Sequence, residues 1–187
     1  TKKLIKNINR IVHSNDKNYS YLIKRQPYFL NKKLSFGGSS NWHLRLFPSG
    51  TTLVEDKNYD QHFKSKLKLK YISGMLYDLN IKNLSEWISS HNKWSTLAQR
   101  DMNNKNSKNK VQPKLFGNKI ERLGFFKSTF YLFPSLMRPF LLFIYKYFIL
   151  LGFLDGKVGF YYCFFNSLWF RTLIDAKKFE KRVLNYK

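Results

Sequence analysis

The 187-residue sequence contains one cysteine and few acidic residues, and both shortages limit the classes of protein to which it can belong. A single cysteine, Cys163, excludes an internal disulfide, which fits a reducing compartment. Its aromatic neighbours predict a small buried side chain rather than a reactive thiol. Only 11 Asp and Glu stand against 34 Lys and Arg, so the formal charge is +23. This charge indicates an anionic partner, which could be nucleic acid, an anionic membrane or phosphorylated substrates, or else a solvated basic surface.

Long apolar runs and common catalytic motifs are also missing. A membrane-spanning helix needs about 18–20 apolar residues, and Lys146, Asp155 and Lys157 interrupt the longest candidates. The sequence has no Gly-rich phosphate loop, no GxSxG and no zinc-finger spacing. The basic, amphipathic first 16 residues lack the apolar centre of a secretory signal. These absences argue against P-loop, α/β-hydrolase and zinc-finger chemistry.

Hydrophobic periodicity predicts a mixed α/β region in the first hundred residues. Apolar residues at helical spacing predict helices, and short alternating runs predict strands. Asn83 or Ser85 is suited to cap the second helix. The predicted helices are 2–13 and 83–102, and the predicted strands are 19–25, 42–47, 51–56 and 67–79.

The composition changes sharply after this region. Residues 103–114 have almost nothing apolar, and we place a polar linker at 103–118. For residues 123–175 we predict a helical hairpin, broken at "GFLDGKVGF" (152–160), that binds an anionic membrane without crossing it. The alternative is a hairpin packed against the preceding domain. The cations expected at the lipid headgroups are Lys146, Lys157, Arg171, Lys177 and Lys178.

Two short motifs carry polar side chains suited to chemistry. In "WHLRLF", His43 and Arg45 share one strand face because strand side chains alternate. In "DQHF", Asp60 and His62 follow Glu55 closely enough to suggest a metal site. Each has a plain alternative, since Arg45 could form an ion pair or be solvated and His62 could be a structural loop residue.

These pieces occur in an order that resembles bacterial family 2 glycosyltransferases, of the kind that builds lipopolysaccharide core and exopolysaccharide. The resemblance runs through "YLIKRQPYFLNKKLSFGG", "WHLRLFPSG", "DQHF", "NLSEWISSHNKWSTLAQRD", "RPFLLFIYKYFILLGFLDGKVGF" and "DAKKFE". Its most specific parts are "RLF" and "GFLDG" with the following Gly159 and Phe160. It covers nearly the whole chain.

The resemblance implies a GT-A fold, which is Rossmann-like, and a divalent metal, Mg or Mn, that binds the donor diphosphate. In the family, aspartate pairs in a preceding nucleotide-sugar domain hold this metal, and no DxD occurs in this chain. The chain corresponds to the part that follows this motif, so we expect it to transfer no sugar alone. A further departure is Asp78, where relatives often have histidine.

The resemblance also assigns roles to five residues. Arg45 and His43 would bind the acceptor, with His43 where the family commonly has Gln. Asp60 would be a catalytic carboxylate near the acceptor, and His62 would be a metal ligand. Asn41 stands where relatives often carry Asp as the candidate base.

The expected fold class is therefore α/β, the C-terminal portion of a GT-A domain followed by a helical hairpin tail. We place the acceptor-side part at 1–102 and the membrane-associating tail at 119–187. The expected function is transfer of a sugar from a nucleotide-sugar donor to a lipid-linked or oligosaccharide acceptor, at the cytoplasmic face of the inner membrane. The alternative is a non-enzymatic basic protein that binds membranes or nucleic acid.

Overall fold

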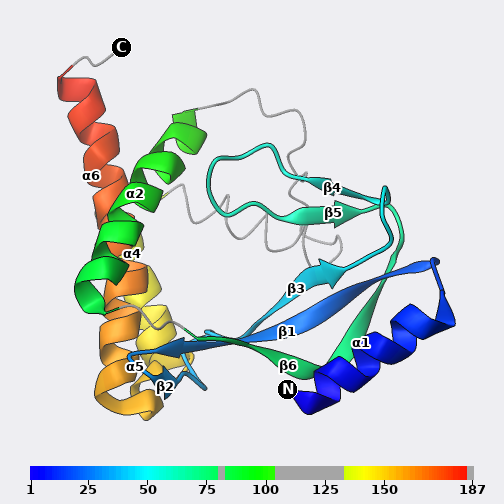
Figure 1. The fold of residues 1–187 in the computed structure, drawn as a ribbon. Helices are drawn as coiled ribbons and strands as arrows, with labels where there is room; N and C mark the ends of the chain where they lie inside the picture. Colours follow the sequence, from blue (N-terminus) through cyan, green and yellow to red (C-terminus); the bar gives the residue numbers. More distant parts are fainter. Residues whose placement is uncertain (80–82, 104–132, 185–187) are drawn as a thin grey trace.

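The structure is a computed structural model that describes residues 1–79, 83–103 and 133–184. Its elements form two parts joined through strand β1 (Figure 1). A small mixed sheet with helix α1 (Lys2–Ser14) lies at one end of the strand. Helix α2 (Leu84–Asn103) and the C-terminal helices lie at the other. The predicted linker, from residue 104 on, and residues 119–132 lie outside the described residues.

Strand β1 (Tyr19–Phe29) is the centre of the larger sheet. It pairs antiparallel with β2 (Lys32–Lys33) and β3 (Asn41–Leu46), and parallel with β6 (Lys68–Asp78). A second, two-stranded sheet is made of β4 (Thr52–Val54) and β5 (Phe63–Ser65). β2 and β5 were not predicted, because runs of two or three residues carry no periodicity.

Helix α1 covers the first half of β1. Its apolar stripe places Leu4 against Tyr21, Ile23 and Ile72, while its lysines face solvent. Gly74 permits this approach, because a Cβ at that position would lie 2.7 Å from the backbone nitrogen of Leu4.

Helix α2 begins where the sequence predicted, and Asn83 is its cap: the Asn83 Oδ1 accepts the Glu86 N–H at 2.9 Å. Trp87 of this helix packs with Phe29 and Leu34 in a core between the end of β1 and the C-terminal helices. At its other end, Ala98 packs on Phe170 and Ile174.

The C-terminal hairpin has two arms, one before and one after its turn. The first comprises α4 (Met137–Ile144) and a π-helical segment, Tyr145–Ile149. A 3-10 turn, Gly152–Asp155, leads to the second arm, which is α5 (Gly156–Cys163), a π-helical segment (Phe164–Trp169) and α6 (Phe170–Val183). The two arms meet at 72°, and only together do they have the length and apolar character of a membrane span; no single helix among the described residues has both.

The turn of the hairpin is tied to the loop between β2 and β3. The buried Asp155 carboxylate accepts the Ser35 N–H at 3.0 and 3.1 Å and the Phe36 N–H at 2.9 Å. Gly37 donates its N–H to the Leu150 carbonyl at 2.8 Å. The hairpin is therefore attached to the sheet region by backbone as well as by side chains.

The α/β class and the helical C-terminal segment, broken at Gly152, are confirmed. Cys163 is buried as predicted, at 1% exposure. The positions of two hairpin cations differ from the expectation. Lys146 donates to Asn166 Oδ1 at 3.2 Å inside the hairpin, and Lys177 donates to helix α2.

Candidate functional site

Strand β3 presents the three predicted residues of its motif next to β1. The register places Asn41 opposite Arg25 and His43 opposite Ile23. Directly opposed residues of a sheet share one face, so Arg25 and His43 are diagonal neighbours within side-chain reach. A bulge near Tyr21 frees Arg45 from a strand partner, and its guanidinium carbon lies 5.5 Å from the centre of the Phe63 ring.

His43 is the electrostatic centre of this group. Burial lowers the pKa of His43, and the charges of Arg25, Arg45 and His62 lower that pKa further, whereas the charge of Asp60 raises it. All four side chains therefore lie within electrostatic range of the imidazole. The net effect favours the neutral imidazole, which has one nitrogen that donates and one that accepts a hydrogen bond.

His62 lies in the loop between β4 and β5, where it faces Glu55. The ring Nδ1 is 3.2 Å from Glu55 Oε2, and Lys57 Nζ donates to the same oxygen at 2.7 Å. Burial raises the pKa of Glu55, but the hydrogen bond and charge of Lys57 and the charge of His62 outweigh it and leave that pKa below its usual value. A lysine already occupies the carboxylate that a metal bound by His62 would use. Among the residues that the structure describes, no three His, Cys, Asp or Glu side chains form a metal site.

Helix α2 holds the same loop over the sheet. The Asp101 carboxylate accepts the N–H of Asn58 at 2.9 Å and of Tyr59 at 2.8 Å. Tyr59 packs between Trp94 and Phe170, with ring centres 6.3 and 5.7 Å away. Asp60 follows in a left-handed conformation, φ 53°, and is exposed. The loop thereby bridges from the small sheet to the helices.

Arg25 was not among the predicted site residues, and the structure places it on β1, between β3 and β6. Its Nε and Nη2 groups both donate to the single oxygen Oδ2 of Asp78, across the parallel β1–β6 pair. Its charge also acts on two tyrosines, Tyr59 and Tyr162, whose pKa values burial raises, that of Tyr162 to about 12. Nothing local in "IKRQPYF" distinguishes this arginine from a solvated one, because its partner is 53 residues away.

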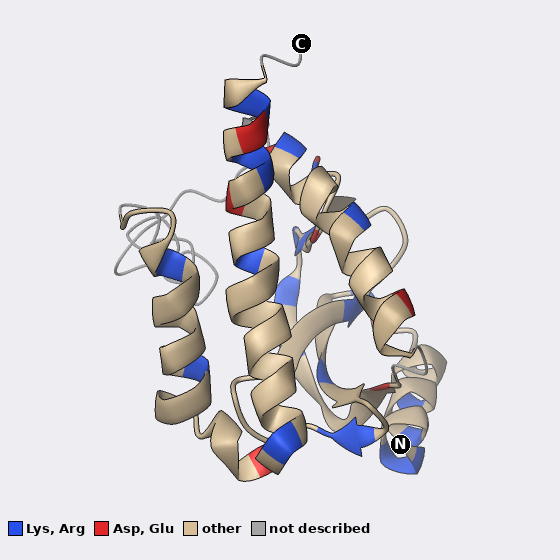
Figure 2. Cartoon of the chain, turned by 90° about the vertical axis from the view of Figure 1, so that its left-hand side faces the viewer, with Lys and Arg blue, Asp and Glu red and all other residues tan. Residues whose placement is uncertain are grey.

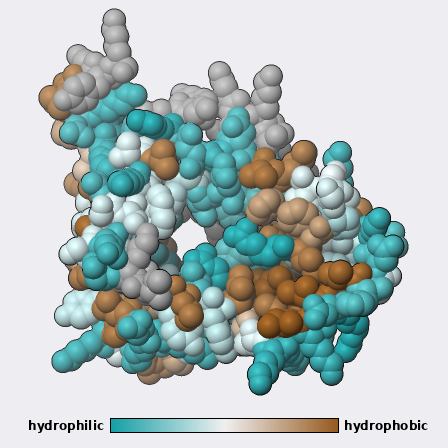
Figure 3. Space-filling view, in the orientation of Figure 1, coloured by the Kyte–Doolittle hydropathy of each residue, from teal (hydrophilic) through white to brown (hydrophobic). Residues whose placement is uncertain are grey.

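We call Arg25, His43, Arg45, Asp60 and His62 the polar cluster. It is contributed by β1, β3 and the β4–β5 loop. The space-filling view shows an opening between the helices and the sheet (Figure 3). Four of its members were predicted, and Asn41 lies beside it on β3, exposed to solvent. The arrangement combines guanidinium groups, a neutral imidazole and one carboxylate, which suits a polyhydroxylated or anionic ligand.

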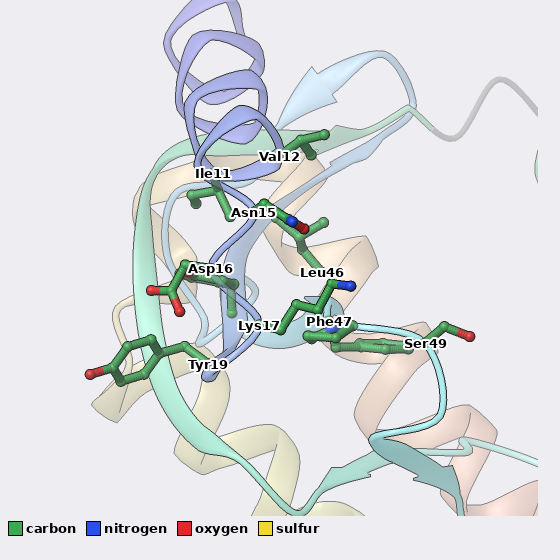
Figure 4. A pocket seen from close by; sticks show the side chains of 11 residues that line it. Ile11, Val12, Asn15, Asp16, Lys17, Tyr19, Leu46, Phe47 and Ser49 are labelled. Atoms are coloured by element: carbon green, nitrogen blue, oxygen red, sulfur yellow. The ribbon is translucent and has the colours of Figure 1, made fainter.

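A separate pocket of about 310 Å³ lies at the end of α1. Ile11 and Val12 of α1 form one side and Leu46 and Phe47 the other, as Figure 4 shows. No residue of the polar cluster lines it. Its lining combines these apolar side chains with Lys17, Tyr19, Tyr21 and Asp16, and the Asp16 carboxylate accepts the Asn18 N–H at 3.0 Å.

Comparison of the chain with protein-family models, with curated proteins and with solved structures gives no match. The family resemblance therefore depends on the motifs quoted above.

Proposed function

We propose that the chain is the acceptor-side part of a glycosyltransferase with a GT-A fold, of the family 2 kind that it resembles. The observation that carries the proposal is the polar cluster. Three residues predicted from two motifs about 17 positions apart, Arg45, Asp60 and His62, act on the imidazole of the fourth, His43, together with an arginine from a third element. The convergence of strand and loop side chains on one imidazole supports a site, and the solvent exposure of Arg45, Asp60 and His62 leaves them accessible to a ligand.

The chemistry assigns a role to each side chain. Inverting transfer requires a carboxylate that takes the proton of the acceptor hydroxyl, and Asp60 is the carboxylate of the cluster. Asn41 has an amide and accepts no proton, so its role is to hydrogen-bond an acceptor hydroxyl. Arg45 and the neutral His43 orient the acceptor sugar. Arg25 bonds to Asp78 and so fixes β1 beside the strand that carries these two residues.

In this scheme the metal is not bound by the described residues. The pair of Glu55 and His62 is already bonded internally, with Lys57 on the same oxygen. In the proposal a Mg or Mn ion and the nucleotide-sugar donor are bound by carboxylates of a donor half, and the described residues supply the acceptor. The reaction is the addition of a sugar to a lipid-linked or oligosaccharide acceptor in cell-surface polysaccharide synthesis. Its proposed place is the cytoplasmic face of the inner membrane, with peripheral attachment.

Acceptor binding tests the proposal without the donor half. The probes are core oligosaccharides released from lipopolysaccharide and short polyprenyl-phosphate sugars, titrated into the chain in isothermal titration calorimetry. We expect binding that Arg45→Gln and His43→Ala each weaken by about tenfold, the loss of about one good hydrogen bond. The matched control, Arg10→Gln on exposed α1, leaves it unchanged.

Two results would overturn the proposal. The first is that no glycan binds, or that the cluster variants bind as the wild type does. The second is that a single-stranded oligonucleotide binds more tightly than every glycan, with strong salt dependence, which favours the basic nucleic-acid-binding alternative. Incubation of the chain alone with nucleotide sugars and these acceptors is expected to give no transfer.

A further inference from the structure

The turn of the C-terminal hairpin exposes a group of large apolar side chains. Ile149 is 67% exposed and Leu154 52% exposed, although both lie in a segment that also contains buried residues. Soluble proteins seldom expose such side chains in a contiguous group without a partner. The group consists of Phe148, Ile149, Leu151, Phe153 and Leu154.

Cations border this apolar group. Lys157 follows the turn in the chain, and the strand β2, which consists of Lys32 and Lys33, lies beside the turn in two views (Figures 1 and 2). All three lysines are exposed. Lys32 Nζ donates to the Asp155 carbonyl at 2.9 Å, which fixes β2 next to the turn. We call these three lysines and the five apolar residues the tip surface.

The tip surface is held as one unit. The Asp155 carboxylate binds the backbone of Ser35 and Phe36, so the loop after β2 cannot separate from the hairpin without breaking buried hydrogen bonds. The acid itself is buried at 6% exposure and faces this loop rather than solvent. The exposed charge of the tip surface is therefore positive.

We propose that the tip surface docks on an anionic lipid bilayer, with the apolar side chains among the acyl chains and Lys32, Lys33 and Lys157 at the headgroup phosphates. Apolar groups ringed by lysines match the layered chemistry of an anionic leaflet, apolar inside and negatively charged at the surface. An uncharged apolar partner would leave Lys32, Lys33 and Lys157 without counter-charges.

This assignment changes which residues meet the lipid. The hairpin cations expected from the sequence included Lys146 and Lys177, and both are engaged inside the molecule. Strand β2 belongs to a different part of the sequence and was assigned no such role. The inference rests on the proposed function only for the purpose of docking, which is to bring the chain to a lipid-linked acceptor.

Vesicle flotation tests the surface with two pairs of variants. Lys33→Glu/Lys157→Glu reverses two charges of the tip, and neither of these side chains makes a hydrogen bond described above. Lys66→Glu/Lys68→Glu makes the same charge change at the exposed start of β6, away from the tip (Figure 1). Phe153→Ser/Leu154→Ser removes tip apolar groups, and Leu53→Ser/Val54→Ser removes exposed apolar groups of β4.

We expect the wild type to float with phosphatidylcholine vesicles that contain phosphatidylglycerol, and far less with phosphatidylcholine alone. The tip charge variant should bind the anionic vesicles at least roughly thirtyfold more weakly, because the loss of each lysine costs about fivefold in affinity. Its control should weaken binding by less than about fivefold. The tip apolar variant should lose binding to both vesicles, whereas its control should not.

Equal losses in the tip variants and in their controls would overturn the inference, because they would show a diffuse charge effect. Absence of flotation would overturn it too. So would a dimer, seen by sedimentation, that the tip apolar variant abolishes while vesicle binding is absent. Oligosaccharide titration of the same variants separates the two proposals: glycan binding that survives loss of flotation leaves the polar cluster standing, and the reverse leaves only the tip surface.

Discussion

Replacement of Lys146 by methionine is expected to stabilise the protein at neutral pH. Lys146 lies in the π-helical segment of the first hairpin arm and donates to Asn166 at 3.2 Å. Burial lowers the pKa of Lys146 from 10.5 to about 8, with a smaller effect from the charge of Arg171. Methionine has a similar length and no charge, so it removes the cost of burying the ammonium group.

The magnitude follows from this shift. The difference between 10.5 and about 8 is about 2.5 pKa units, which corresponds to about 3 kcal/mol against the charged amine, from its burial first and from the charge of Arg171 second. The lost hydrogen bond to Asn166 costs about 1 kcal/mol. Lys146→Met should therefore raise the free energy of unfolding by about 2 kcal/mol at pH 7.

The pH dependence has a definite sign. Below pH 8 the amine is protonated in both states, and the folded state bears the full cost. Between pH 8 and 10.5 the folded state has released the proton while the unfolded state still binds it, so the stability of the wild type rises with pH. The advantage of the methionine variant should accordingly shrink across this window.

Urea unfolding followed by tryptophan fluorescence, at pH 7 and at pH 10, measures both quantities. Tyrosines and other lysines titrate in the wild type and the variant alike, so the difference between the two curves isolates Lys146. The matched control is Lys93→Met on the exposed side of α2, which should show no pH-dependent difference. A destabilised methionine variant at pH 7, or a difference that does not change with pH, would refute the reasoning.

Two further predictions concern the elements that hold the site. Gly159→Ala should destabilise the protein by about 3 kcal/mol in urea unfolding, because its Cβ would lie 2.2 Å from the Gly152 carbonyl oxygen. In the control, Gly50→Ala, the backbone is strained but the new Cβ meets open space, so the variant should lose about 1 kcal/mol. Equal losses in the two variants would contradict the packing argument. Asp101→Ala should speed amide exchange at Asn58 and Tyr59 by at least about tenfold, and unchanged exchange there would show that the loop holds itself.

Local patterns were sufficient for most of the helices and the long strands. The apolar stripe of α1, the cap at Asn83 and the break at Gly152 each depend on residues close in sequence. The position of Lys146 could not be predicted in this way. A π-helical segment has i→i+5 hydrogen bonds, so a helical wheel drawn with 3.6 residues per turn predicts the wrong side-chain directions there. Lys146 turns towards Asn166.

The polar cluster shows the same limit at longer range. Alternation alone predicted that His43 and Arg45 would share a strand face, but it could not predict the bulge that leaves Arg45 without a strand partner. The meeting of Arg25 with Asp78 requires the parallel pairing of β1 and β6, and no pattern within either strand reveals that pairing. Sequence motifs thus predicted the strand and the loop of the candidate site, whereas the position of Arg25 beside them could be seen only in the fold.

The tip surface and the polar cluster are connected by one strand and one loop. β1 runs from the sheet to the hairpin, where Phe29 packs on Tyr162 with ring centres 5.6 Å apart. The loop that Asp155 binds continues directly into β3, and within it Ser40 donates to the carbonyl of Arg25 at 3.1 Å. A displacement of the hairpin at the membrane would therefore act on both strands that carry the cluster. If the two proposals hold, docking fixes the acceptor side of the site relative to the bilayer, which is what a lipid-linked acceptor requires, since its sugar extends only a short distance from the headgroups.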